Sequence, residues 1–121
     1  MSDYTDTLRK LSIRDDAYVE ALLTDDRTNL KASGFDRKTH ALVQLGAMVA
    51  IDPAPPSYMR LIDVALECNA SPDEIVGTLI AAMPAVGVAR VVSAAPKLGL
   101  ALGYDVAAAL EELDNGRRRL R

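Results

Sequence analysis

The chain has 121 residues, a mass of 13.0 kDa, 50% apolar residues and a net charge of −3. This length fits one domain over residues 1–121, and the apolar and charged fractions argue against global disorder. A pI of about 5.1 argues against general affinity for nucleic acids or anionic membranes.

The sequence also bears on where the protein resides. The longest uncharged run, residues 75–89, is interrupted by glycine and proline and is shorter than the roughly 20 residues that span a bilayer. The first ten residues, MSDYTDTLRK, lack the apolar core of a signal peptide. A single cysteine, Cys68, excludes an internal disulfide and a zinc site of several cysteines. We expect a reduced, cytoplasmic protein with no membrane segment, metal or cofactor.

Aromatic residues make up only 4% of the chain, so the core must be built from Ala, Leu, Val, Ile and Met. Three of these residues, Ala, Leu and Met, have high helix propensity. No stretch shows sustained alternation of apolar and polar residues, and no Asn-Gly or Asp-Gly turn joins two β-branched runs. The sequence predicts an all-α fold of about six helices.

The first predicted helix covers residues 12–24, with Ser12 or Asp15 as its N-cap. A polar connection over residues 24–29 follows it. The second predicted helix runs over residues 36–50. Its apolar face contains Leu42, Leu45, Gly46 and Val49, and its opposite face contains His40, Gln44 and Ala47.

The prolines of residues 52–56 predict an extended turn, after which the third helix begins at Pro56 or Ser57. The apolar face of this helix is predicted to contain Ser57, Leu61, Val64, Ala65 and Cys68. The fourth helix has the clearest start, because Ser71, Pro72 and Glu74 form a capping-box sequence. It ends at Pro84 or Gly87.

Residues 88–102 predict a fifth, almost wholly apolar helix that bends near Pro96. Two successive helices with so few charges must be buried on most sides, which in a small domain indicates burial between subunits. A last amphipathic helix is predicted over residues 105–113, followed by the arginine-rich tail of residues 117–121. One basic run on an acidic protein favours a solvated helix end over nucleic-acid binding.

Three segments carry a resemblance to a known family: FDRKTHAL at residues 35–42, ALECNASPDEI at residues 65–75, and GVA at residues 87–89. Over residues 35–104 the chain resembles the carboxymuconolactone decarboxylase-like family, which also contains the alkyl hydroperoxidase D-type proteins. The resemblance implies an all-α alkyl hydroperoxidase D-like bundle that assembles as homotrimers or homohexamers.

The catalytic positions of that family are not kept. Where peroxidase-type members carry C-x-x-C-x-x-x-H, this chain has Ala54, Ser57 and Leu61, and the assisting glutamate falls near Leu42. Decarboxylase-type members also use a histidine at the position of Leu61, and leucine transfers no proton. Thiol–disulfide chemistry needs two sulfurs, and this chain has one.

Several side chains remain candidates. His40 is the only imidazole, Ser57 marks the family pocket at a helix start, and Arg60 could orient an anionic ligand. Cys68 lies near the end of its helix, where a thiolate is disfavoured, so a structural role is preferred over redox sensing. The acidic pairs at residues 15–16 and 25–26 are interpreted as solvated charges.

Two functional interpretations follow. The preferred one is a diverged oligomer that binds a small molecule near Ser57, Arg60 and Leu61, or acts as a structural protein. The alternative is an enzyme of the same family with His40 as proton carrier and Ser57 or Arg60 as the substrate-orienting group.

Overall fold

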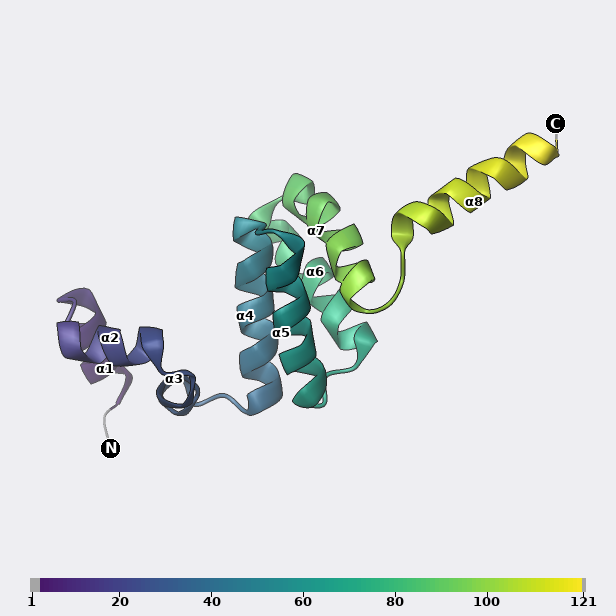
Figure 1. The fold of residues 1–121 in the computed structure, drawn as a ribbon. Helices are drawn as coiled ribbons and strands as arrows, with labels where there is room; N and C mark the ends of the chain where they lie inside the picture. The colour runs from purple at the N-terminus through teal and green to yellow at the C-terminus, as the bar shows by residue number, and fades with distance from the viewer. Residues whose placement is uncertain (1–2, 121) are drawn as a thin grey trace. The chain divides into compact units, whose positions relative to one another are not determined.

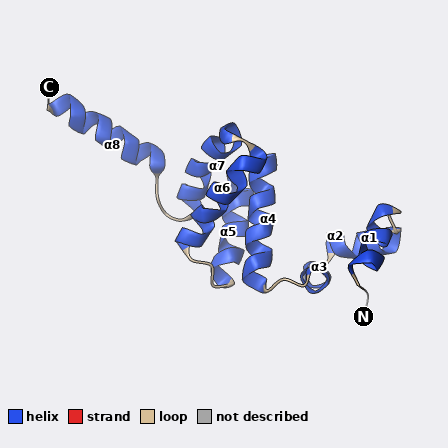
Figure 2. Ribbon diagram, turned by 180° about the vertical axis from the view of Figure 1, so that it is seen from behind, coloured by secondary structure: helices blue, strands red, loops and turns tan. Residues whose placement is uncertain are grey.

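The computed structural model describes residues 3–120, which form eight α-helices and no strand (Figure 1; Figure 2). The predicted all-α class is therefore confirmed for the described residues, whereas the prediction of about six helices is wrong. Contacts divide the chain into an N-terminal unit (Met1–His40) and a C-terminal unit (Ala41–Arg121), and each is described by itself. Met1, Ser2 and Arg121, the last residue of the predicted arginine-rich tail, lie outside the described residues.

The N-terminal unit contains α1 (Tyr4–Ser12), α2 (Asp16–Thr24) and α3 (Asp26–Ser33). The helices α1 and α3 were not predicted. Ser12 does not cap the predicted helix but ends α1, and most of the predicted connection over residues 24–29 belongs to α3.

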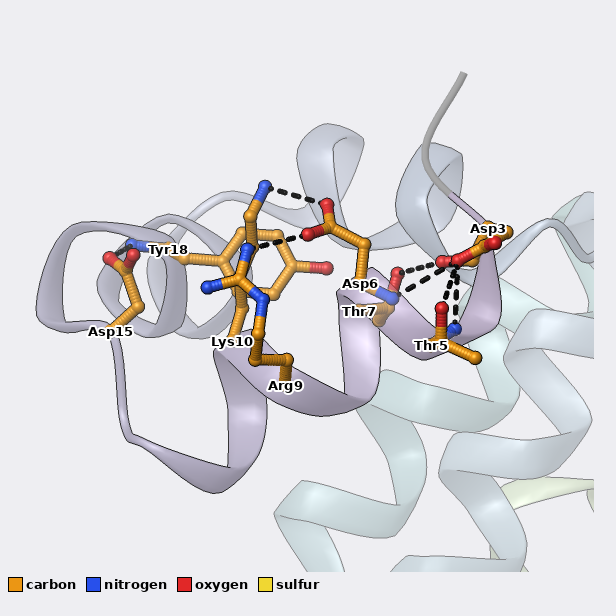
Figure 3. Close-up of polar contacts among 8 residues, drawn as sticks. All are labelled: Asp3, Thr5, Asp6, Thr7, Arg9, Lys10, Asp15 and Tyr18. Atoms are coloured by element: carbon orange, nitrogen blue, oxygen red, sulfur yellow. Dashed lines mark hydrogen bonds and ion pairs between the residues drawn. The ribbon is translucent and has the colours of Figure 1, made fainter.

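Carboxylate N-caps start all three of these helices. Asp3 accepts hydrogen bonds from the backbone N–H groups of Thr5 and Asp6, both at 3.1 Å (Figure 3). Asp15, one of the two predicted caps, accepts from the Tyr18 N–H at 3.2 Å. Asp25 caps α3 in the same way. Since no residue of α1, α2 or α3 is buried, local capping rather than a core shapes this unit.

Charged side chains connect α1 to α2 along their surfaces. Asp6 pairs with Arg9 at 2.6 Å and with Lys10 at 3.4 Å (Figure 3). The Lys10 ammonium in turn lies 5.2 Å from the centre of the Tyr18 ring. These are exposed or half-buried contacts, each of which contributes little to stability.

The C-terminal unit is built on α4 (Arg37–Ile51, which begins in the N-terminal unit), α5 (Pro55–Glu67), α6 (Pro72–Val86) and α7 (Val88–Ala101). These four helices pack side by side (Figure 1; Figure 2). All buried residues among those described lie here: Ala41, Leu45, Val49, Tyr58, Ile62, Ala65, Ala70, Ile75, Leu79, Val91, Ala94 and Leu98.

The predicted face of α4 is confirmed at Leu45 and Val49, which are fully buried. Asp36 starts this helix as predicted, because its carboxylate accepts from the Thr39 N–H at 2.7 Å. Gly46 lies where α4 approaches α6, since a Cβ there would be 3.5 Å from Thr78 Cγ2.

The predicted face of α5 is confirmed at Ala65 and is wrong by one residue at Ser57 and Leu61. Tyr58 and Ile62 are fully buried with Ala65, whereas Ser57 is exposed and Val64 is 38% exposed. The helix also begins at Pro55, within the predicted extended turn, because proline is tolerated in the first helical turn. One residue rotates a helical position by about 100°, so a one-residue shift changes which side faces the core.

The connection from α5 to α6 is short, and hydrogen bonds hold both of its ends. Asn69 adopts a left-handed conformation (φ +68°) after α5, and the N–H of the buried Ala70 donates to the Ala65 carbonyl at 3.0 Å. Ser71 then starts α6 with the predicted capping box, in which both reciprocal hydrogen bonds with Glu74 measure 3.0 Å. Pro84 lies inside α6, which ends at Gly87.

The last helix, α8 (Val106–Arg119), is longer than expected, and Asp105, the first residue of the predicted helix, is its N-cap. The arginine tail, predicted to follow the helix, is helical through Arg119. No residue of α8 is buried. Within residues 3–120, no helix is long and apolar enough to cross a membrane.

Candidate functional site

Four polar side chains from three segments meet in the C-terminal unit. Asp52 lies in the turn after α4, Tyr58 on α5, and Ser93 and Lys97 on α7. The Asp52 Oδ2 accepts a 2.6 Å hydrogen bond from Ser93 Oγ. The Asp52 Oδ1 accepts from Lys97 Nζ at 2.9 Å and from the Tyr58 hydroxyl at 3.2 Å. We call these four residues the Asp52 cluster.

Local backbone structure brings these groups together. Asp52 has φ +46°, a left-handed conformation that aspartate tolerates better than most residues, and its N–H donates to the Met48 carbonyl. This ends α4 and turns the chain toward α5. Ser93 and Lys97 are four residues apart, which places both on the same side of α7.

The cluster has a defined charge state. The Ser93 hydroxyl, and after it the Lys97 ammonium, lower the pKa of Asp52 from 3.8 to about 2. Burial, together with the hydrogen bond to Asp52, raises the pKa of Tyr58 to about 12. At neutral pH the Asp52 carboxylate is therefore an anion that pairs with Lys97. It also accepts hydrogen bonds from the neutral Tyr58 and from the Ser93 hydroxyl.

This arrangement suits a structural clamp better than acid–base catalysis. A carboxylate with a pKa near 2 is a poor general base at neutral pH, and Ser93 directs its proton to that carboxylate. Lys97 also donates to the Pro53 carbonyl at 3.4 Å and lies 5.9 Å from the Tyr58 ring centre. The side chains thus tie the α4–α5 turn to α7.

The candidate residues on α5 divide between solvent and core. Ser57 is exposed in the first turn, and its N–H donates to the Ala54 carbonyl at 3.1 Å. Arg60 is exposed on the next turn. Leu61 is half-buried and packs against the core, as does Leu42. Ser57 and Arg60 are accessible to a solute, while Leu61 contributes to packing.

His40, the candidate proton carrier, belongs to the N-terminal unit. His40 Nε2 lies 2.7 Å from Asn29 Oδ1, and Asn29 Nδ2 donates to the Leu22 carbonyl at 2.9 Å. Because the Asn29 amide nitrogen faces a carbonyl, its oxygen faces His40, which requires a proton on Nε2. The hydrogen bond of the His40 ring is therefore made with Asn29 and not with Ser57 or Arg60.

The other residues considered from the sequence take local positions. Cys68 is half-buried and follows the last residue of α5. In the acidic pairs, Asp15 and Asp25 are helix N-caps. No group of three or more His, Cys, Asp or Glu side chains that could hold a metal ion occurs within residues 3–120.

Two surface hollows lie in the N-terminal unit. One is open, has a volume of about 570 Å³, and is lined by Asp25, Arg27, Thr28, Leu30, Lys31, Gly34 and Phe35. The other, of about 180 Å³, is lined by Thr7, Leu11, Tyr18, Leu22, Asn29, Ala32 and Ser33. Ser57, Arg60 and Leu61 do not line either hollow.

Sequence reasoning missed the Asp52 cluster. The available signal was the pair Ser93 and Lys97, whose polar groups interrupt an otherwise mostly apolar helix at i, i+4 spacing and so require partners. Comparison of the chain with protein-family models, curated proteins and solved structures gives no match. The resemblance to the carboxymuconolactone decarboxylase-like family stays a prediction.

Proposed function

We propose that the protein is a diverged, self-associating member of the carboxymuconolactone decarboxylase-like family that acts as a structural or small-molecule-binding oligomer. One observation carries this proposal. Large aliphatic side chains on α6 and α7 are 43% to 67% exposed: Val76, Ile80, Val88, Val92 and Leu100. We call these five residues the apolar face.

The spacing of these residues supports an interface. Val76 and Ile80 on α6, and Val88 and Val92 on α7, are four residues apart, which places each pair on one side of its helix. Leu100 lies two turns after Val92 and about 80° further round α7. Exposed small apolar residues lie between them, namely Ala81, Pro84, Ala85, Ala89 and Pro96. The whole segment of residues 75–102 carries two charges, Arg90 and Lys97, and Lys97 is paired with Asp52.

The apolar face supplies a large part of the area that an interface needs. Five aliphatic side chains supply on the order of 400 Å², taking about 80 Å² for each. The small residues between them extend this area toward the roughly 800 Å² that each partner buries in a stable interface. Soluble monomers rarely expose contiguous apolar patches of more than a few hundred Å². A second copy of the chain is the partner that we propose.

The residues at the family's catalytic positions support a protein without the family's chemistry. Ala54, Ser57 and Leu61 provide no thiolate and no imidazole, and the Asp52 cluster is closed on itself. We expect no turnover of an organic hydroperoxide with a dithiol reductant. Turnover that is lost in Cys68→Ser would instead support a redox role for Cys68.

Light scattering of the full chain at micromolar concentration tests the self-association. We expect a trimer or hexamer, and we expect Ile80→Glu with Val92→Glu to dissociate it. The control is Leu23→Glu on α2, where a leucine more exposed than Ile80 and Val92 lies outside the apolar face. A single 13.0 kDa species for the unmodified chain would overturn the proposal.

An enzymatic function is the second candidate, favoured by the joint exposure of Ser57 and Arg60 near the start of α5. The Ser57 hydroxyl and the Arg60 guanidinium together suit an anionic substrate. Titration with small carboxylates, followed by NMR, tests this function. Shifts at Ser57 and Arg60 that disappear in Arg60→Gln would support it, and unchanged spectra would contradict it.

A further inference from the structure

The helix α8 presents an apolar edge that its own chain does not cover. Leu110 and Leu113 on α8 and Leu120 at its C-cap are 60%, 62% and 90% exposed, and no residue of α8 is buried. Elsewhere in the C-terminal unit each helix buries at least two side chains in the common core. This edge is therefore a surface that still needs a partner.

The spacing along the edge is that of a coiled coil. Val106, Leu110 and Leu113 are separated by four and three residues, and Leu120 follows one heptad after Leu113. Arg117 occupies the remaining position of this seam. The positions beside the seam are mostly small, with Ala107, Ala109 and Gly116, so a second helix can approach closely.

Charge determines which partner fits. The middle of α8 is acidic, with Glu111, Glu112 and Asp114, and its end is basic, with Arg117, Arg118 and Arg119. A parallel copy would place basic end against basic end and Arg117 against Arg117. An antiparallel copy places Leu110 opposite Leu120 and the acidic middle opposite the basic end, and it also opposes the helix dipoles.

We propose that α8 pairs in antiparallel orientation with α8 of a second copy of the chain. The pair has a two-fold axis, so it makes a closed, isologous contact. This inference rests on the proposed self-association through the apolar face: if that face builds trimers, α8 pairs join two trimers into a hexamer. The apolar face and α8 then control different steps of assembly.

The start of α8 is held in place for such a contact. The Tyr104 N–H donates to the Gly99 carbonyl at 2.7 Å, and a Cβ on Gly99 would lie only 2.8 Å from the Tyr104 carbonyl oxygen. The connector therefore packs directly on the end of α7. The Asp105 carboxylate then accepts from the Ala108 N–H at 3.0 Å and starts the helix.

The first experiment measures the particle mass of the full chain by light scattering. We expect a hexamer, and we expect Leu110→Glu with Leu120→Glu to halve its mass, because the two glutamates would face each other in the antiparallel pair. Both side chains are exposed, so their replacement leaves the core intact. The control is Ala108→Glu, which lies on the side of α8 away from the seam. A mass unchanged by the double substitution would overturn α8 pairing.

The outcomes separate this inference from the proposed function. A trimer that the double substitution leaves intact contradicts α8 pairing while preserving assembly through the apolar face. A dimer that becomes a monomer supports α8 pairing and contradicts the proposed trimer. A monomeric unmodified chain contradicts both.

A second experiment tests orientation by disulfide formation in the Cys68→Ser background. We expect a mixture of Leu110→Cys and Leu120→Cys chains to give a mixed disulfide, because these positions face each other in the antiparallel pair. Disulfides formed by each variant with itself, without the mixed product, would overturn the antiparallel orientation.

Discussion

The two units of this chain are stabilised by different physical means. The N-terminal unit starts each helix with an aspartate cap and buries no described residue. The C-terminal unit buries twelve residues from four helices and the α5–α6 connection in one apolar core. Apolar burial is cooperative and depends on distant contacts, whereas a cap acts on one helical turn. A substitution in the C-terminal unit should therefore change the stability of that whole unit. A substitution in the N-terminal unit should change only the helix in which it lies.

The largest expected effect is that of removing the Tyr58 ring, the largest of the fully buried side chains. We expect Tyr58→Ala to lower the free energy of unfolding by about 3–5 kcal/mol, the cost typical of deleting a buried aromatic ring. Tyr4→Ala, at a 77% exposed position in the N-terminal unit, should change it by less than about 0.5 kcal/mol. Urea unfolding followed by circular dichroism measures both.

Should Tyr58→Ala fail to fold, Ile62→Val gives a graded version of the same test, with an expected loss of about 0.5–1.5 kcal/mol. Equal stability of Tyr58→Ala and Tyr4→Ala would show that the contrast between the two units is wrong.

The next effect is the loss of folding stability in acid that we expect from the Asp52 cluster. Folding lowers the pKa of Asp52 from 3.8 to about 2, so its contribution to stability is present above about pH 4 and is lost as the pH falls toward 2. In Asp52→Asn we expect a lower stability at neutral pH and a shallower loss between pH 4 and pH 2. Urea unfolding across this pH range measures the difference.

Asp63→Asn, which removes an exposed carboxylate from α5, is the matched control and should behave like the unmodified chain. An identical pH profile for Asp52→Asn would mean that the cluster does not clamp the α4–α5 turn. Acid should also weaken the N-terminal caps, because hydrogen bonds from neighbouring groups lower the pKa values of Asp3 and Asp25.

A smaller loss is expected at Gly99, where α7 meets the connector to α8. A Cβ there would lie 2.8 Å from the Tyr104 carbonyl oxygen and 2.9 Å from Val106 Cγ2, so Gly99→Ala should cost about 1–3 kcal/mol. Gly77→Ala is the control, since α6 has open space at that position. It should raise stability by up to about 1 kcal/mol through helix propensity. Stabilisation by both substitutions would contradict the close packing of the connector.

The smallest effect compares one helix cap from each unit. Ser71→Ala should cost about 1 kcal/mol of global stability, because α6 belongs to the core. Asp25→Ala should leave the global unfolding midpoint unchanged and speed amide hydrogen exchange only in α3. Ser57→Ala, at an exposed position on α5, should cost less than Ser71→Ala. Samples need equal concentrations, because the stability of an oligomer depends on concentration.

Local signals predicted much of this fold. The capping box at Ser71, the cap at Asp36 and the apolar face of α4 follow from spacing alone, and the structure confirms them. The same rules would have found α1, where Tyr4, Leu8 and Leu11 follow the Asp3 cap, and α3, where Asp25 caps a polar helix. The polar composition of residues 24–29 predicts a connection, although a short capped helix can also be polar.

Other features depend on tertiary contacts that no local pattern contains. On α5 two neighbouring stripes were both mostly apolar, and packing against α7 rather than periodicity selected Tyr58 and Ile62 over Ser57 and Leu61. The Asp52 cluster joins residues 41 and 45 positions apart in the chain. The pair Ser93 and Lys97 indicates that a partner is needed, but it cannot indicate that the partner is Asp52.

The closed connection between α5 and α6 also bears on how this chain can be engineered. Asn69 ends one helix, Ser71 starts the next, and the single residue between them, Ala70, is 5% exposed. An inserted residue there would either replace Ala70 at its buried position or displace α6 along α5. Tags, reporter domains and new termini for circular permutation are therefore better placed in the connection between α1 and α2, where Ile13 and Arg14 are exposed.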